Sequence, residues 1–215
     1  MNKELITIID YGIGNLLNVV RAFEHIGAQV KVAESKKDII SAGKLVLPGV
    51  GAFANGMHEL KVRDFIEPIK AHARSGDPLL GICLGMQMLF DSSEEFELAE
   101  GLRLIPGKVV KIPDLGVNGT VHKIPHIGWN ELLEVNSNSW NNSIFHNVAK
   151  SSATYFVHSF MGVPSDDRYR LANCDYNGVK ICAAIQRDNV SGCQFHPERS
   201  GEIGLNILSN FLNKE

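Results

Sequence analysis

A cysteine between two glycines, at the end of an apolar run, is the feature that most constrains how this chain folds. The run Leu79–Ile82 is typical of a short buried strand, and Gly85–Phe90 after it has helical spacing. A residue on such a sharp strand-to-helix turn projects above the sheet edge, and flanking glycines serve where no Cβ fits. The pattern predicts a nucleophile elbow with the sulfur of Cys83 as the attacking atom, beside a helix N-terminus that favours the thiolate. A buried structural cysteine is the alternative.

A histidine and a glutamate far downstream supply the groups that a thiol nucleophile needs. The stretch Val190–Phe195 is typical of a strand, and His196-Pro197-Glu198 follows it directly. Proline keeps the residue before it extended, which allows His196 and Glu198 to lie on the same side of the chain. A thiol needs a base to take its proton, and the base needs a third group to orient its ring. We therefore predict a catalytic triad of Cys83, His196 and Glu198.

A third segment offers backbone donors. The short strand Leu45–Leu47 ends in Pro48-Gly49-Val50-Gly51, where the glycines leave backbone N–H groups free to turn. Attack on an amide carbonyl builds negative charge on its oxygen, and preorganised N–H groups stabilise that charge. We expect an oxyanion hole formed by the N–H of Leu84 and by N–H groups at Val50 and Gly51.

Strand-like and helical segments alternate through the first half of the chain. Leu5–Ile9, Gln29–Val32, Leu45–Leu47 and Leu79–Ile82 are rich in β-branched and aliphatic residues, and helical spacing separates them. This order predicts an α/β fold with a mostly parallel central sheet that helices cover on both faces. Short strand-like pieces with Gly and Pro over Val109–Trp129 predict an antiparallel extension.

The remaining local predictions are more specific. Thr154–His158 and Ile181–Ile185 are expected to be further core strands, and Gly204–Leu212 a closing helix. We expect Asn15 to cap the first helix and Asp91–Glu95 to form a solvated acidic turn. Residues 1–215 are predicted to form a single domain, because nothing in the chain has the composition of a linker.

Composition excludes several classes of function. With 44% hydrophobic residues the chain can bury one good core, and its net charge of −3 comes without a basic block, so nucleic acid is not an expected partner. No apolar run has the length of a membrane span or a secretory signal. The four cysteines show neither Cys-x-x-Cys pairing nor zinc spacing, which favours a reducing cytoplasm and predicts no metal. Gly12-Ile13-Gly14 lacks the third glycine of a dinucleotide fingerprint, where Leu17 stands, so no nucleotide cofactor is expected.

The three segments together resemble the class I, triad-type glutamine amidotransferases. The resemblance rests on Pro48–Gly51, Gly81–Gln87 and Phe195–Glu198, in the order of that family. It implies a three-layer, flavodoxin-like fold and hydrolysis of L-glutamine to glutamate and ammonia. Three further segments resemble the HisH group, the glutaminase subunits of imidazole glycerol phosphate synthase in histidine biosynthesis: Lys123–Asn130, Tyr155–Ser159, and Ser200-Gly201 with Gly204-Leu205.

The resemblance also implies roles for individual residues. Substrate contacts are implied for Gly49, Gln87, Glu95, Ser159 and Phe160. Glu95 is matched to the position that holds the α-amino group of glutamine, and the neighbouring Glu94 is the alternative. The expected partner is a HisF-like (β/α)8-barrel cyclase that forms a heterodimer with the chain and receives its ammonia. Interface contacts are expected from Pro125, His126, Trp129, Asn130 and Tyr155.

Three other functions compete with this interpretation. One is a HisH-like paralogue that supplies ammonia to a barrel partner aminating a nucleotide-sugar precursor of surface polysaccharide. Another is an inactive homologue that serves as a scaffold for the barrel, which the intact Cys83, His196 and Glu198 argue against. The third is a free cysteine amidase, which the segment Pro125–Asn130 argues against because it resembles a partner-binding element.

Overall fold

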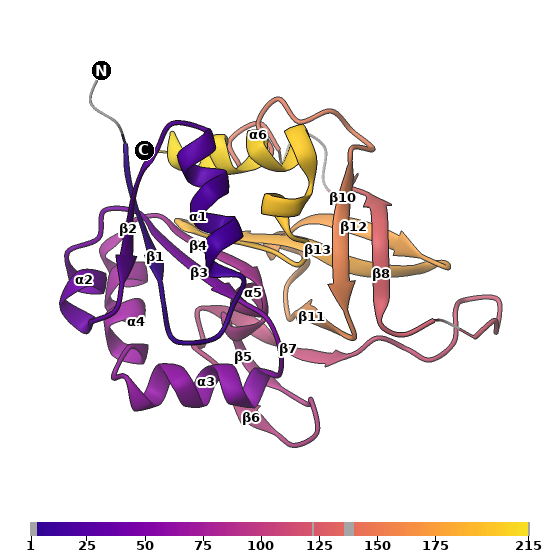
Figure 1. Ribbon diagram of the computed structural model, residues 1–215. Helices are drawn as coiled ribbons and strands as arrows, with labels where there is room; N and C mark the ends of the chain where they lie inside the picture. Colours follow the sequence, from indigo (N-terminus) through magenta and orange to yellow (C-terminus); the bar gives the residue numbers. More distant parts are fainter. Residues whose placement is uncertain (1–3, 122, 136–139, 215) are drawn as a thin grey trace.

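The computed structural model describes residues 4–121, 123–135 and 140–214, and its centre is an eight-stranded sheet (Figure 1). The strand order is β2-β1-β3-β4-β14-β13-β12-β9. The parallel part consists of β1 (Leu5–Ile9), β2 (Gln29–Ala33), β3 (Leu45–Gly49), β4 (Leu79–Cys83) and β14 (Val190–Cys193). Antiparallel strands complete one side: β13 (Val179–Arg187), β12 (Arg170–Tyr176) and β9 (Leu133–Glu134).

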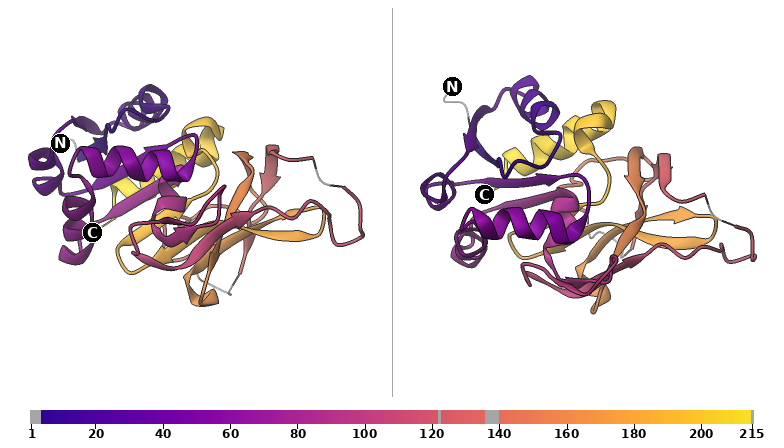
Figure 2. Two further views of the ribbon diagram at one scale, coloured as in Figure 1. Left: turned by 90° about the horizontal axis from the view of Figure 1, so that it is seen from below. Right: turned by 60° about the horizontal axis from the view of Figure 1, so that its bottom comes forward.

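Helices cover both faces of the parallel part, which confirms the predicted three layers (Figures 1 and 2). One face carries α1 (Leu16–His25) and α6 (Gly201–Leu212), and the other carries α2 (Lys36–Ile40), α3 (Phe53–Val62) and α4 (Ile66–Ser75). The pleat sends alternate side chains to opposite faces. Val46 accordingly packs in the core under α1 and α6, whereas Leu45 and Leu47 pack in the core on the opposite face.

Two smaller sheets form the extension, which is antiparallel as predicted except for one parallel pair of strands in the larger of the two sheets. A four-stranded sheet has the order β11-β7-β5-β6, with β5 (Phe90–Ser93), β6 (Ala99–Glu100), β7 (Ile105–Lys111) and β11 (Phe160–Pro164). A two-stranded ribbon pairs β8 (His126–Glu131) with β10 (Ala153–His158), and Figure 1 shows the two strands side by side. The remaining elements described are the short helix α5 (Leu84–Met88) and two single turns of 3-10 helix, η1 (Asp167–Tyr169) and η2 (Pro197–Arg199).

Several local predictions were wrong. Thr154–His158 lies in the ribbon with β8 and not in the central sheet, because only alternate residues of β10 are buried. The expected acidic turn begins with strand β5, which pairs with β7. Asn15 stands at the N-cap position of α1, but its side chain makes no capping hydrogen bond. Among the described residues, no helix is long and apolar enough to cross a membrane.

Candidate active site

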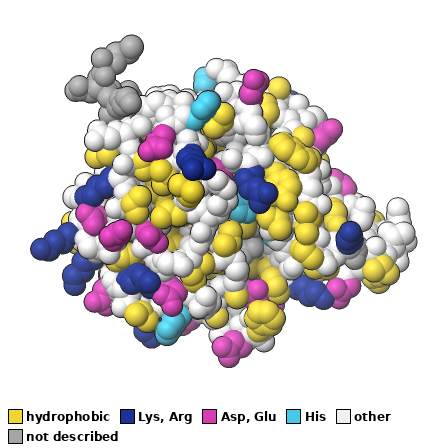
Figure 3. All heavy atoms as spheres, in the orientation of Figure 1, with side chains coloured by type: hydrophobic (Ala, Val, Ile, Leu, Met, Phe, Trp, Pro, Cys, Tyr) yellow, Lys and Arg dark blue, Asp and Glu magenta, His cyan; other side chains and the backbone are white. Residues whose placement is uncertain are grey.

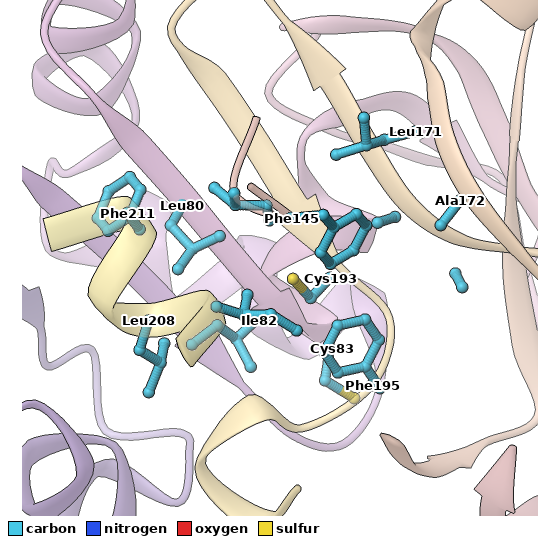
Figure 4. Packing of buried hydrophobic residues seen from close by; sticks show 14 of the residues in the cluster. Leu80, Ile82, Cys83, Phe145, Leu171, Ala172, Cys193, Phe195, Leu208 and Phe211 are labelled. Carbon is cyan, nitrogen blue, oxygen red and sulfur yellow. The ribbon is translucent and has the colours of Figure 1, made fainter. Parts of the chain in front are cut away.

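Cys83 lies at the C-terminal end of β4, where the chain turns into the short helix α5 (Leu84–Met88). Its backbone is forced to φ 54° and ψ −110°, a conformation that L-residues rarely adopt. A Cβ on Gly81 would lie 2.7 Å from the carbonyl oxygen of Gly85, and a Cβ on Gly85 would collide with the carbonyl oxygen of Leu47. Both glycines are therefore required for the elbow to pack. Figure 4 shows Cys83 at the end of the buried row formed by Leu80 and Ile82.

The strand order explains how distant segments meet at this cysteine. β4 lies between β3 and β14, with Gly49 in register with Cys83 on one side and Cys193 in register with Ile82 on the other. The carboxyl ends of parallel strands meet at one edge of a sheet, which is where open α/β sheets bind their ligands. The segment Pro48–Gly51 after β3 and the segment Gln194–Glu198 after β14 consequently flank Cys83.

His196 is held by a set of short hydrogen bonds. Its Nδ1–H donates to Oε1 of Glu198 at 2.8 Å, and its backbone N–H donates to the carbonyl of Tyr155 at 2.9 Å. The hydroxyl of Ser200 donates to the carbonyl of His196 at 2.7 Å and accepts the backbone N–H of Tyr155 at 3.0 Å. The side chains of His196 and Glu198 are almost completely buried. Ring orientation and tautomer are thereby fixed, as a general base requires.

The environment of His196 favours its charged form. Burial alone would lower the pKa of this imidazole, but hydrogen bonds and negative charge from Cys83 and Glu198 outweigh burial and raise the pKa to about 10. The ring is therefore an imidazolium at neutral pH, and its positive charge stabilises negative charge on the neighbouring sulfur.

One buried glutamine contacts the sulfur, and a second buried glutamine supports the first. The amide nitrogen of Gln194 lies 3.9 Å from Sγ of Cys83 and points a donor at it. Gln87 donates to Oε1 of Gln194 at 3.1 Å and to the carbonyl of Phe160 at 3.0 Å. Gln87 was implied by resemblance, whereas Gln194 was missed, although its place two residues before His196 at the end of a strand was a usable signal.

The cysteine opens into a cavity of about 450 Å³. Its wall includes most of the predicted site residues, namely Val50, Gly51, Cys83, Leu84, Gln87, Glu95, Ser159, Phe160 and His196. Three further lining residues were not predicted: Phe96, Val157 and His158. Glu198 lies behind His196, as an orienting group should. Among the described residues, no group of three or more His, Cys, Asp or Glu side chains is arranged to hold a metal ion.

The structure separates the two candidate glutamates. Glu95 lines the cavity, and its Oε2 accepts the backbone N–H of Phe53, the first residue of α3, at 2.7 Å. Glu94 instead forms an exposed ion pair with Lys108 at 2.7 Å. The cavity position favours Glu95 as the carboxylate that meets a ligand.

The predicted oxyanion donors come from two segments that meet beside the cysteine. Leu84 is the first residue of α5, so its N–H is one of the free donors at a helix start. Val50 and Gly51 follow β3, where Val50 is 38% exposed and Gly51 has φ 98°. Gly49 packs between these donors, because a Cβ there would lie 3.1 Å from Cβ of Leu84.

The residues expected at the partner interface gather on the ribbon of β8 and β10. Trp129 is 59% exposed and packs edge-on against Tyr155, whose ring also lies under the guanidinium of Arg199. Pro125 is exposed and Asn130 half-buried. His126 differs from the prediction, because its side chain is only 2% exposed and supports the ribbon from behind.

A buried histidine pair connects this ribbon with the cavity. Burial lowers the pKa of His158 to about 3 and that of His126 to about 4, so both rings are neutral at pH 7. Nδ1–H of His158 donates to the carbonyl of Phe160 at 2.8 Å, which leaves Nε2 to accept from Nδ1–H of His126 at 3.1 Å. The chain of bonds ends at the backbone of Phe160, beside Gln87.

Comparison with known proteins agrees with this geometry. The family profile described as glutamine amidotransferase class-I matches residues 7–214, and the chain belongs to that family. Within it, the chain is 54% identical over 208 residues to the imidazole glycerol phosphate synthase subunit HisH 1 of Legionella pneumophila (strain Lens), covering 96% of this chain and 98% of the relative. The subunit HisH of Syntrophotalea carbinolica is 47% identical with the same coverage. The solved structure of PurLQS from Thermotoga maritima has the same fold, with a TM-score of 0.71 at 22% identity over 99% of both chains.

Proposed function

We propose that this chain hydrolyses L-glutamine to glutamate and ammonia as the glutaminase subunit of imidazole glycerol phosphate synthase, in histidine biosynthesis. The observation that carries the proposal is the convergence of Cys83 and a buried His196–Glu198 pair on one cavity. The HisH relatives, which are 47–54% identical over nearly the full length, support the assignment to histidine biosynthesis. Their names favour histidine biosynthesis over the nucleotide-sugar alternative.

The first chemical step is acyl transfer to sulfur. The thiolate of Cys83 attacks the side-chain carbonyl carbon of glutamine, and the carbonyl electrons move to oxygen. N–H groups of Leu84 and of the Val50–Gly51 segment stabilise that oxyanion. As the tetrahedral intermediate collapses, His196 gives its proton to the departing nitrogen, which leaves as ammonia, and a glutamyl thioester remains.

The second step regenerates the enzyme. Neutral His196 takes a proton from water, and the resulting hydroxide adds to the thioester carbonyl. Collapse releases glutamate and returns the sulfur to its starting state beside a protonated imidazole. Glu198 holds the ring in one orientation through both steps and stabilises its charged form.

The polar end of the substrate is assigned to the far wall of the cavity. Glu95 holds the α-ammonium group with the carboxylate oxygen that Phe53 leaves free. The carboxylate end lies against the backbone of Ser159 and Phe160, a wall that Gln87 supports by donating its two amide N–H groups to Phe160 and Gln194, and Gly49 keeps the approach to the sulfur clear. Both ends of glutamine thereby find charged or polar partners, which fixes the carbonyl over Cys83.

The ammonia is proposed to pass to a HisF-like (β/α)8-barrel cyclase subunit bound as a heterodimer. The exposed Trp129 with Tyr155 and Arg199 forms an aromatic and cationic cluster of the kind that anchors interfaces. Direct transfer protects ammonia from protonation in water. We place the reaction in the cytoplasm, in keeping with four free cysteine thiols, and treat residues 1–215 as one glutaminase domain.

Glutamate release from glutamine tests the proposal. Wild type and Cys83→Ala are assayed with and without a histidine-pathway cyclase and its phosphoribosyl ligand. We expect strong stimulation by the liganded cyclase, and loss of activity in Cys83→Ala. A basal rate that persists in Cys83→Ala would overturn the triad. A thiol-dependent rate that the cyclase does not stimulate would overturn the assignment to the histidine pathway.

A further inference from the structure

Tyr11 is a buried polar residue that the mechanism above does not use. It follows β1 after one residue, and its side chain is 0% exposed. It packs against Pro48–Gly51, which we call the oxyanion segment. Its hydroxyl donates to the carbonyl of Pro48 at 2.8 Å. The pairing of β1 with β3 ends with Ile8 opposite Val46, two residues before Pro48. The phenol thus extends the contact between these strands to the point where the oxyanion segment begins.

The same hydroxyl also touches the next residue. A Cβ on Gly49 would collide with Oη of Tyr11 and would lie 3.1 Å from Cβ of Leu84. Gly49 is therefore enclosed between the phenol and the residue that carries the other oxyanion donor. Burial is the main cause that raises the pKa of the Tyr11 hydroxyl above its ordinary value, and the negative charge of Cys83 raises it further. The hydroxyl therefore stays protonated and remains a donor throughout the working pH range.

We propose that Tyr11 is the positioning residue of the oxyanion hole: its hydroxyl fixes the Pro48 carbonyl against Gly49 and so sets where the N–H groups of Val50 and Gly51 begin. The carbonyl of Pro48 and the N–H of Gly49 belong to one planar peptide unit, so a bond to that carbonyl orients the peptide that leads into Val50 and Gly51. Because the hydrogen bond holds that carbonyl, any backbone rotation that redirects the oxyanion donors has to take place within Gly49, Val50 and Gly51. The proposal rests on the glutaminase function and adds a residue to it.

The role makes a separable kinetic prediction. Tyr11→Phe keeps the ring and removes only the hydroxyl, so the fold should be retained. Negative charge on the substrate oxygen develops after binding, so we expect kcat to fall about tenfold while KM for glutamine stays within about twofold. Tyr176→Phe is the matched control, because it removes a hydroxyl that donates to the carbonyl of Lys123 at 2.6 Å, outside the cavity wall.

A ligand that mimics the tetrahedral state gives a second readout. The γ-aldehyde analogue of glutamine adds the Cys83 thiol across its carbonyl, the sulfur bonding to carbon and the proton ending on oxygen. We expect its affinity to fall about tenfold in Tyr11→Phe while the affinity for glutamate is unchanged. A merely structural role would weaken both ligands together or neither.

A double-mutant cycle tests the contact with Gly49. Gly49→Ala should lose most activity, because its methyl meets the hydroxyl, and Tyr11→Phe should restore part of it by removing that oxygen. Equal losses from Gly49→Ala in both backgrounds, or an unchanged kcat in Tyr11→Phe, would overturn the role of Tyr11. If wild type neither hydrolyses glutamine nor binds the aldehyde, the glutaminase function itself fails.

Discussion

The two segments that flank Cys83 are held in very different ways. On the β14 side, His196 makes side-chain and backbone hydrogen bonds to Glu198, Tyr155 and Ser200, all within 3.0 Å, and is buried. On the β3 side, the oxyanion segment begins at the carbonyl of Pro48, which Tyr11 holds, and continues into Val50, which is partly exposed. The proton-transfer side is thus built rigidly, and the charge-stabilising side is open to adjustment. We therefore expect substitutions on the β14 side to lower activity by changing the orientation of the His196 ring. Substitutions on the β3 side should lower it by changing the backbone conformation of the oxyanion segment.

The largest effect is expected on the rigid side, from Glu198→Gln. The amide keeps the shape of the side chain but no longer stabilises the imidazolium, so we expect kcat to fall about 10³–10⁴-fold. Steady-state glutamate release measures this. Glu94→Gln is the control, because Glu94 pairs with Lys108 on the surface and should leave kcat unchanged. A fall of less than about tenfold in Glu198→Gln would show that the two sides do not differ as described.

The charge on His196 should make the rigid side sensitive to pH. Its pKa of about 10 lies above the value of about 6.5 in an unfolded chain, so its contribution to the free energy of unfolding is full below pH 6.5. The contribution is lost as the pH rises through about 10. Guanidinium titrations of wild type and His196→Gln should therefore differ most at low pH and converge at high pH. A difference that grows with pH would contradict the assigned charge.

Ser200→Ala should have an intermediate effect. It leaves the part-buried N–H of Tyr155 without this partner and removes one of two bonds to the carbonyl of His196, which the N–H of Arg199 still reaches at 3.0 Å, so the free energy of unfolding should fall by about 1–3 kcal/mol. We expect kcat to fall about tenfold through the displaced ring. Ser152→Ala, which removes an exposed bond to the carbonyl of Ala149, is the control. Equal stability losses in the two variants would argue against a special support of His196.

The smallest effect is expected from Gly51→Ala, on the adjustable side. A Cβ there meets nothing within 4 Å, so the cost arises from φ 98° alone and should be about 1 kcal/mol. Gly76→Ala carries the same kind of cost at φ 91°, with open space around it, at the end of α4. Thermal unfolding should therefore respond equally to both changes, whereas kcat should fall a few-fold only in Gly51→Ala. Equal kcat values would remove Gly51 from the oxyanion segment.

The sequence carries enough local signal to predict the elbow and the architecture. The apolar run before Cys83, the flanking glycines and the alternation of strands and helices are all short-range patterns, and the structure confirms the α/β layers. The prediction placed Thr154–His158 in the wrong sheet, because its sequence is typical of any half-buried strand. Nothing local in the sequence shows which sheet such a strand joins. The face in Figure 3 intersperses basic and acidic side chains, in keeping with a net charge of only −3.

Apart from the position of Gln194, two residues before His196, the sequence offers no local signal for the supporting contacts of the site, and the reason is physical. Ser200 acts on Tyr155, Gln194 on Cys83, and Tyr11 on Pro48, each across dozens of residues of chain. These contacts depend on which strands become neighbours in the sheet, and side-chain periodicity does not encode that order. His126 shows the reverse error, because its place in an interface-like segment hid its inward direction.

The carboxylate of Glu95 belongs to two structures at once, the wall of the cavity and the first turn of α3. An ammonium group arriving at this carboxylate would draw electron density away from the bond to the amide of Phe53. The amide at the start of α3 would therefore respond to whether the cavity holds a ligand. The nitrogen resonance of that single amide would report glutamine entering and glutamate leaving, without a label on either ligand.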